Sequence, residues 1–438
     1  MSDTDAQSVF FMRDTMLPQV PPPAGQSGPV RWLRENLFSG WFNTILTICG
    51  LIALYFLLRG LLPWFAHSVW TADTLSECRQ IIAAKWGPDA TGACFAVVRE
   101  RWTQWLFGFY PRHLYWRPVL TLVLMFVAMA PVLFPGVPRK LMIFSAIYPF
   151  LGFWLLWGGS AWVPLGGMAG FVLGYIAWRV LRENRPLVGI LVAVVIALLW
   201  WLLLAGPVID LFRSIAPLAI ESVRSDRFGG FVLSLTIGVA AIAISLPLGI
   251  ALALGRQSDM FLIKTLSVGF IEFIRGVPLI TLLFTASLLL NYFLPPGTNF
   301  DIILRVIIMV SLFAAAYIAE VIRGGLAALP RGQYEAADSL GLDYFQAQRL
   351  IVLPQALKIS IPGIVSVFIG LFKDTTLVIF VGLLDPLKGI TDAVRASIDW
   401  KGIYWEPYIF VGSIFFLFCF GMSRYSMYLE RRLKRDHR

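Results

Sequence analysis

The stretch that decides the fold lies in a polar interval, residues 323–360, between two apolar segments. It contains Glu335-Ala336-Ala337, then Gly341, and then Ile351-x-Leu353-Pro354. Such a polar interval between apolar runs predicts a segment that lies outside the hydrocarbon layer of a membrane. The order and spacing of these residues are the most specific signal in the chain.

The residue types around this stretch predict two short helices joined by a tight turn. Pro330 ends any helix that precedes it, and residues 333–340 are good helix formers. Gly341 stands where a helix commonly ends in a left-handed residue. Asp343 is a suitable N-cap for a second helix, which we expect to end before Pro354.

The two alanines of this stretch are small enough to let a partner protein approach closely. An amphipathic hairpin that lies at the membrane interface without a partner is the alternative. Glu-Ala-Ala, a glycine six residues after the glutamate, and Ile-x-Leu-Pro form a much rarer set than such a hairpin, and they favour a surface that a partner protein binds. Its predicted members are Glu335, Ala336, Ala337, Gly341, Leu342 and Asp343.

The composition identifies an integral membrane protein. The chain has 438 residues, of which 58% are hydrophobic and only 14% charged, with a mean hydropathy of +0.75. Soluble domains are about half apolar and about a quarter charged. The repeated apolar runs have the length of membrane-crossing helices, so we expect an all-α polytopic protein rather than a barrel.

The apolar runs predict ten transmembrane helices. A polar tail, residues 1–41, precedes the first run, and no cleavable signal peptide is recognised there. The fourth run is rich in glycine, which can let two helices pack closely. The predicted spans are 42–58, 118–134, 141–158, 164–181, 186–206, 230–254, 276–294, 302–322, 361–383 and 408–422.

Lysine and arginine residues near the span ends predict the orientation, since cytoplasmic loops carry most of them. The short loops around Ser160 and around Pro295-Pro296 carry none, and we place them outside. The net charge of +10 reflects these clusters and not a nucleic-acid site. Both termini are then cytoplasmic, together with Arg139-Lys140, Arg179, Arg182, Arg185, Arg256, Lys264 and the tail from Arg424 to Arg438.

The long loop 66–117 then lies outside, in the periplasm of a cell with two membranes. Cys78 and Cys94 could form a disulfide in that oxidising compartment, or they could be two unpaired thiols. The aromatic residues of the loop predict that part of it lies on the bilayer surface, and a docking site for a soluble partner is the alternative. These aromatics are Trp70, Trp86, Trp102, Trp105, Tyr110 and Trp116.

The apolar runs of the first half are nearly free of charge, whereas those of the second half carry several charged residues. Lys373-Asp374-Thr375-Thr376 is predicted near the middle of a span, where a lone charge costs about 2.5–3.5 kcal/mol. It could contact a zwitterionic amino acid, or Lys373 and Asp374 could form a structural ion pair between helices or with a second permease. Glu272 with Arg275 and Glu320 with Arg323 are one helical turn apart. For these, structural pairs are favoured over a place in the substrate pathway.

The second half, 227–438, resembles a permease subunit of the polar amino-acid ABC importers. The resemblance rests on residues 335–354 and on three further stretches. The longer N-terminal region, 42–226, resembles that of the larger permease of the general L-amino-acid importers, and residues 164–206 look like a helix pair added to it. The three stretches are Phe273–Leu279 (Phe-Ile-Arg-Gly-Val-Pro-Leu), Ala316–Gly325 (Ala-Tyr-Ile-Ala-Glu-Val-Ile-Arg-Gly-Gly) and Phe372–Val378 (Phe-Lys-Asp-Thr-Thr-Leu-Val).

The resemblance implies a five-helix type I importer core and transport of L-amino acids from periplasm to cytoplasm. It also implies three kinds of partner: a second permease, a dimer of ATPase subunits and a periplasmic amino-acid-binding protein. ATP and Mg²⁺ would be bound by the ATPase, because the sequence contains no Gly-x-x-x-x-Gly-Lys-Ser/Thr loop. No catalytic residues, cofactor or metal ligands are expected in this chain.

Two other classes of function would explain part of the pattern. An ion-coupled secondary amino-acid transporter would account for the intramembrane charges, but it would leave residues 335–354 unexplained. A non-transporting membrane scaffold would account for the aromatic loop and the added helices, while Lys373 and Asp374 would remain without a purpose.

Overall fold

The computed structural model describes residues 28–181, 186–293 and 301–435. The predictions for the first 27 residues, for Arg182 and Arg185, and for the Pro295-Pro296 turn fall outside these residues. The chain forms two compact units, Met1–Val69 with Arg79–Ala93, and Trp70–Cys78 with Cys94–Arg438. We describe each unit by itself.

The smaller unit contains the first apolar helix. α1 (Gly28–Asn36) precedes α2 (Trp41–Ala66), and most of α3 (Leu75–Trp86) follows. α2 continues eight residues beyond the predicted end at Leu58, through Arg59. The His67 ring stacks on Trp86, with ring centroids 4.8 Å apart.

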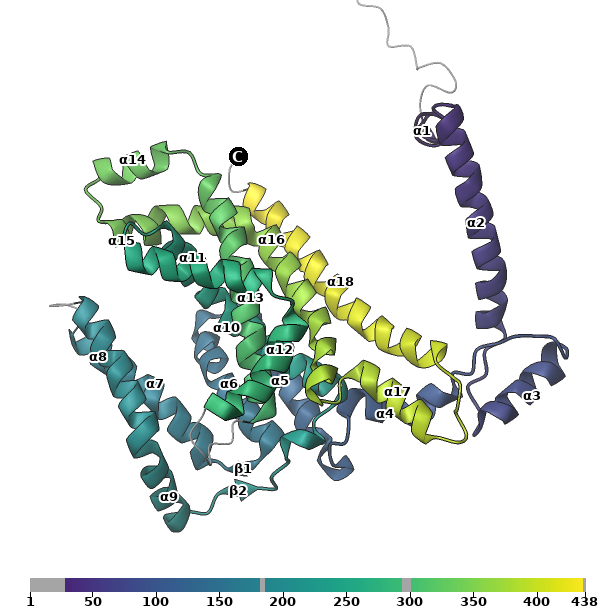
Figure 1. Ribbon diagram of the computed structural model, residues 1–438, viewed down its shortest axis with the longest axis horizontal. Coiled ribbons are helices and arrows are strands. Elements are labelled where there is room, and N and C mark those ends of the chain that lie inside the picture. The colour runs from purple at the N-terminus through teal and green to yellow at the C-terminus, as the bar shows by residue number, and fades with distance from the viewer. Residues whose placement is uncertain (1–27, 182–185, 294–300, 436–438) are drawn as a thin grey trace, which may run out of the picture. The chain divides into compact units, whose positions relative to one another are not determined.

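The larger unit begins with the remaining N-terminal helices (Figure 1). β1 (Gly159–Ser160) pairs antiparallel with β2 (Ala219–Ile220). The predicted added pair, observed as α7 to α9, therefore begins and ends beside two paired strands and returns to the end from which it started. The helices are α4 (Ala96–Phe107), η1 (Arg112–Leu114), α5 (Trp116–Leu133), η2 (Arg139–Leu141), α6 (Met142–Trp157), α7 (Trp162–Leu181), α8 (Pro186–Leu199), η3 (Trp200–Leu204) and α9 (Ala205–Ile215).

The glycines of α7 allow close helix packing, as the sequence predicts. The Trp200 and Trp201 side chains donate hydrogen bonds to the carbonyls of Gly166 and Gly167, at 2.8 and 3.0 Å. A Cβ at Gly170 would lie only 2.2 Å from Nε1 of Trp201. The glycine face is thus used within the hairpin itself.

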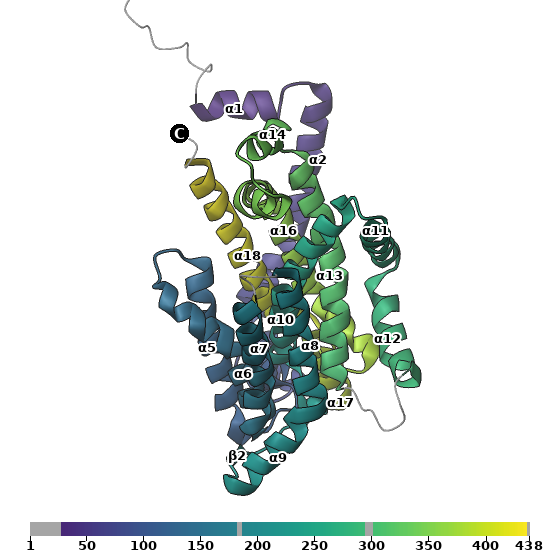
Figure 2. The same cartoon turned by 90° about the vertical axis from the view of Figure 1, so that its left-hand side faces the viewer.

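The rest of the larger unit is the permease-like core. α10 and α13 lie side by side at its centre (Figure 2) and bury Leu233, Ile237, Val306 and Val310 between the core helices. The elements are η4 (Ser225–Arg227), α10 (Gly230–Gln257), α11 (Phe261–Gly276), α12 (Leu279–Phe293), α13 (Ile302–Ala327), α14 (Gly332–Ser339), α15 (Tyr344–Ala347), η5 (Gln348–Val352), α16 (Leu353–Asp374), η6 (Thr375–Val381), α17 (Pro386–Ala396) and α18 (Trp405–Arg435).

The number of long apolar helices agrees with the sequence, with one break. Among the described residues, nine helices are long and apolar enough to cross a membrane, and a pair bent by 102° makes a tenth if it counts as one span. That pair is α11 and α12. The predicted span 276–294 therefore corresponds to α12, and the amphipathic helix α11 was not predicted. Val277-Pro278 forms the break, because proline disfavours helix at the residue before it.

The ninth predicted span, 361–383, is also different in the structure. The second short helix does not end before Pro354, because α15 continues through the π-helical turn η5 into α16. Pro354 stands in the first turn of α16, where a missing N–H is tolerated. At the other end, α16 stops at Asp374 and the chain tightens into the 3₁₀ helix η6.

The larger unit has two distinct ends. α14, α15 and the C-terminal end of α18 lie at one end, and the turn between α5 and α6 points the same way. β1, β2 and α17 lie at the other end (Figures 1 and 2).

The segment from α3 to α5 is packed more tightly than its aromatic content suggested. Trp105 is fully buried and Tyr110 nearly so, whereas Trp70, Trp102 and Trp116 are exposed. The bilayer-surface prediction is therefore wrong for Trp105 and Tyr110. α4, which carries Trp105, packs on α10, α17 and α18, and the Tyr110 hydroxyl donates to the Leu156 carbonyl at 2.8 Å.

A disulfide within this segment joins Cys78 and Cys94, with Cα atoms 6.1 Å apart. Two hydrogen bonds hold the segment to the core. The backbone N–H of Cys94 donates to Glu406, at 2.8 Å, and the Trp400 indole donates to Glu100, at 2.6 Å. The segment thus contacts both the connection between α17 and α18 and the first turn of α18.

Asp385 caps α17 from a buried position. Its carboxylate accepts hydrogen bonds from the backbone N–H groups of Leu387 and Lys388, at 3.0 and 3.2 Å. Burial disfavours the charged form and raises the pKa of Asp385 to about 6. The N–H groups and the Lys388 charge oppose this shift but do not cancel it.

We expect Asp385 to make the protein less stable as pH rises through 6. The native state holds this proton at a pH where the unfolded chain, with its ordinary pKa near 3.8, has lost it. Stability should therefore fall between about pH 4 and 7, by at most about 3 kcal/mol. Asp385→Asn, which keeps a capping oxygen, should flatten the melting temperature of the purified protein over this range. An unchanged pH dependence would contradict the assignment.

Candidate functional site

The turn after α14 has the geometry that its sequence predicts. The Gly341 N–H donates to the carbonyl of Asp338 at 2.9 Å, and the Leu342 N–H donates to that of Ala337 at 3.2 Å. These two bonds form a Schellman motif, which needs a left-handed residue at its centre. Gly341 has φ of +69°, so glycine supplies the conformation without strain.

The helix after this turn begins with a capping box. The Asp343 carboxylate accepts from the Gln346 N–H at 2.7 Å, while the Gln346 side chain accepts from the Asp343 N–H at 3.3 Å. The predicted N-cap at Asp343 is confirmed. Two opposed caps therefore hold the turn between α14 and α15 in one conformation.

The outward face of this turn is both acidic and apolar. Glu335 and Ala336 are exposed, and Glu335 forms no ion pair with a described residue. Leu340, Tyr344 and Phe345 are also exposed, by 72%, 64% and 69%. We call these five residues the coupling face.

Ala337 does not belong to the coupling face. It is fully buried, on the side where α14 lies against η5. We predicted that both alanines let a partner protein approach closely. This is wrong for Ala337, whose small side chain instead allows close packing within this chain.

Close contacts connect α14 and the neighbouring ends of α13 and α16. A Cβ at Gly325 would lie 2.2 Å from the Ser360 hydroxyl oxygen and 2.6 Å from the Ala356 carbonyl oxygen. Gly325 thus lets the end of α13 approach α16. The Gln355 amide donates to Gln333 at 2.8 Å and connects α16 to α14. α14 is therefore held to α16, which in turn packs closely on the end of α13.

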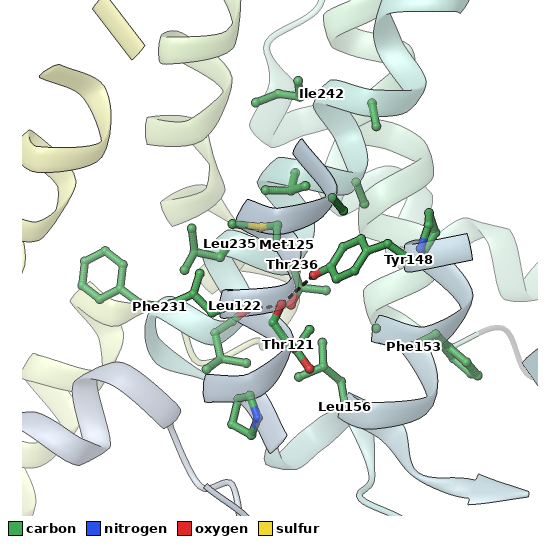
Figure 3. A pocket seen from close by; sticks show the side chains of 18 of the residues that line it. Thr121, Leu122, Met125, Tyr148, Phe153, Leu156, Phe231, Leu235, Thr236 and Ile242 are labelled. Atoms are coloured by element: carbon green, nitrogen blue, oxygen red, sulfur yellow. Dashed lines mark hydrogen bonds between the residues drawn. The ribbon is translucent and has the colours of Figure 1, made fainter. Parts of the chain in front are cut away.

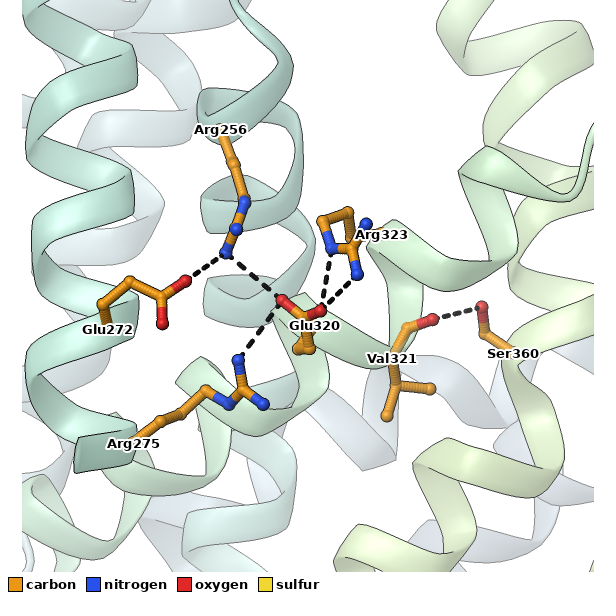
Figure 4. Close-up of polar contacts among 7 residues, drawn as sticks. All are labelled: Arg256, Glu272, Arg275, Glu320, Val321, Arg323 and Ser360. Carbon is orange, nitrogen blue, oxygen red and sulfur yellow. Dashed lines mark hydrogen bonds and ion pairs between the residues drawn. The ribbon is translucent and has the colours of Figure 1, made fainter. Parts of the chain in front are cut away.

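Five charged side chains meet where α10, α11 and α13 converge, close to this end of the core (Figure 4). Glu320 accepts from Arg323 at 2.8 Å, and it contacts Arg256 at 3.2 Å and Arg275 at 3.4 Å. Arg256 also contacts Glu272, at 2.9 Å. We call this group the arginine cluster; its three arginines exceed its two glutamates by one charge.

The arginine cluster was only partly predictable. The pair Glu320–Arg323 is confirmed. The pair Glu272–Arg275 is wrong, because Glu272 pairs with Arg256 and Arg275 reaches Glu320. Arg256 lies 16 residues from Glu272 and 64 from Glu320, and no local spacing rule connects positions so far apart.

Lys373 and Asp374 occupy the end of α16 and not the middle of a span. Lys373 is exposed and Asp374 half-buried, and neither forms an ion pair with a described residue of this chain. Thr375 is fully buried and its hydroxyl donates to the Phe372 carbonyl at 2.7 Å, while that of Thr376 donates to Lys373 at 2.9 Å.

Comparison with known proteins places the chain in a family. A family model described as "Binding-protein-dependent transport system inner membrane component" matches residues 245–435. The chain is 64% identical to the "Glutamate/glutamine/aspartate/asparagine transport system permease protein BztC" of Rhodobacter capsulatus, over the full length of both. It is 38% identical to the "Inner membrane amino-acid ABC transporter permease protein YhdY" of Escherichia coli, over 96% of this chain and 98% of the relative.

A solved structure described as an amino acid ABC transporter with histidines is 31% identical, over 46% of this chain and 91% of that chain, with a TM-score of 0.41. The chain belongs to the inner-membrane permeases of binding-protein-dependent ABC transport. Within that family it groups with the amino-acid permeases. It is a multi-pass inner-membrane protein, and the resemblance found in its sequence is confirmed.

Proposed function

We propose that this chain forms part of the path by which acidic amino acids and their amides enter the cell. The observation that carries the substrate class is the 64% identity, along the whole chain, to a relative named for glutamate, glutamine, aspartate and asparagine transport. Transport would run from periplasm to cytoplasm, with both termini in the cytoplasm.

Energy would come from ATPase subunits that bind the coupling face. The exposed carboxylate of Glu335 and the apolar surface of Leu340, Tyr344 and Phe345 suit a protein groove better than solvent. ATP and Mg²⁺ would be held by those subunits and not by this chain. A second permease and a periplasmic amino-acid-binding protein would complete the importer.

Lys373 and Asp374 are the proposed substrate contacts. An amino acid carries one ammonium and at least one carboxylate, which complement these two charges. Thr375 and Thr376 would shape the site, since the bonds of their hydroxyls to backbone carbonyls fix the 3₁₀ turn. Glu272 already pairs with Arg256, and Arg275 pairs with Glu320, which favours a structural role over substrate contact.

The test is uptake into proteoliposomes that contain the whole importer, its binding protein and internal ATP. Glutamate, glutamine, aspartate and asparagine should be taken up only with ATP. Lys373→Ala and Asp374→Ala should each reduce uptake about tenfold or more, the effect of losing a charge-assisted contact. Lys401→Ala and Asp399→Ala, in an exposed connection, should not. Uptake driven by an ion gradient without ATP would contradict the proposal.

A further inference from the structure

An apolar groove of about 1470 Å³ lies between the α5–α6 pair and the core helices α10, α13 and α18 (Figure 3). On α10 it is lined from Phe231 to Leu246, a length of about 22 Å at 1.5 Å per residue. Among the described helices, α5 and α6 pack on each other but do not pack closely on α10. The groove occupies the space between them.

The walls of the groove are mostly apolar, and their hydroxyl groups donate within the protein. The hydroxyl of Tyr148 donates to the Thr121 carbonyl at 3.0 Å, as Figure 3 shows. The hydroxyls of Thr121, Ser145 and Thr236 each donate to a backbone carbonyl as well. An amino acid would lose most of its hydration here for few hydrogen bonds in return. A hydrocarbon chain has no hydrogen bonds to water and would lose none on entering the groove.

Contacts bridge the groove at both ends. At one end the Tyr425 hydroxyl donates to the Leu133 carbonyl at 2.6 Å. At the other, Trp157 stacks on Phe228, with ring centroids 4.6 Å apart, and donates to Ser225 at 2.8 Å. A transmembrane helix must leave a groove at both ends. A lipid acyl chain can enter from the side and needs no exit.

Three cations lie near the Leu133 end in the sequence of the elements that meet there. Arg139 and Lys140 belong to η2, in the turn between α5 and α6, and Arg424 precedes Tyr425. All three are exposed, and none forms an ion pair with a described residue. In the orientation proposed above, this end is cytoplasmic. Basic sites between transmembrane helices on that side suit anionic lipid head groups.

We propose that this groove binds an anionic phospholipid of the cytoplasmic leaflet. One acyl chain fills the groove and the phosphate lies among Arg139, Lys140 and Arg424. The lipid fills the space between the α5–α6 pair and the permease core. It thereby connects two parts of the protein that make few direct backbone contacts with each other.

The test is native mass spectrometry of the purified importer after exchange into phosphatidylglycerol or phosphatidylcholine. Ala243 lines the groove on α10, and Ala251 is an exposed residue of the same helix outside it. Wild type and Ala251→Phe should retain phosphatidylglycerol, and Ala243→Phe should lose it. If Ala243→Phe does not assemble, the smaller change Ala240→Leu blocks the same wall.

The head-group contacts have their own matched variants. The double variant Arg139→Gln/Lys140→Gln should bind phosphatidylglycerol about 25-fold more weakly, at about fivefold per basic residue. Arg179→Gln, an exposed cation of α7 away from the groove, should bind as wild type does. Equal retention by Ala243→Phe and Ala251→Phe, or equal retention of the two lipids by wild type, would overturn the proposal. Since lipid retention is measured without transport, this result is independent of the substrate assignment.

Discussion

Replacing Gly341 with proline is expected to abolish ATP-driven uptake while the protein still inserts into the membrane. Proline fixes φ near −65°, whereas the turn requires +69°. Proline also lacks the N–H that donates to Asp338. The two losses together amount to about 2–3 kcal/mol, enough to reduce the native turn about 30-fold or more. Uptake into proteoliposomes and the amount of protein in membranes are the two measurements.

Gly341→Asn is the matched control for this experiment. Asparagine tolerates the left-handed conformation and retains the N–H. No heavy atom lies within 4 Å of the position where its Cβ would be, so no clash is added. We expect this variant to retain most of the uptake. Normal uptake by Gly341→Pro would show that the turn is not needed for coupling.

Neutralising Glu320 is the second change with a large expected effect. Glu320→Gln removes the negative charge that faces Arg256, Arg275 and Arg323. The three cations then repel each other where α10, α11 and α13 meet. Because the cluster is only partly buried, we expect a loss of about 2 kcal/mol rather than the larger penalty of a fully buried charge. A lower melting temperature and slower uptake should accompany it.

A surface pair and a double-mutant cycle serve as controls. Asp210→Asn breaks an equivalent i,i+3 pair with Arg213 on an exposed helix, where a change within about 0.5 kcal/mol is expected. Combining Glu320→Gln with Arg256→Gln should destabilise less than the sum of the two, because the second change relieves repulsion. Strict additivity would mean that the cluster does not act as a unit.

Local sequence patterns were sufficient for much of this fold. Gly341 and Asp343 act within four residues, so their capping roles could be predicted from residue type alone. The apolar runs likewise predicted the long helices, because membrane crossing requires a minimum apolar length.

The failures arose where distant segments meet or where helices continue through expected breaks. Trp105 and Tyr110 are buried by segments far along the chain, which a local pattern does not reveal. Their amphipathic side chains alone predicted a place at the bilayer interface. Glu272 pairs across helices with Arg256. The helix through Pro354 continues because the π-turn before it accommodates a missing N–H, which a rule based on single residues does not foresee.

The coupling face is proposed to bind the ATPase. Affinity purification of this chain from its own cells in mild detergent, beside Glu335→Arg and the matched Glu430→Arg on α18, tests it most directly. We expect an ATPase and a second permease to co-purify with wild type and Glu430→Arg, and the ATPase to be lost from Glu335→Arg. Recovery of the same ATPase with all three proteins would contradict it.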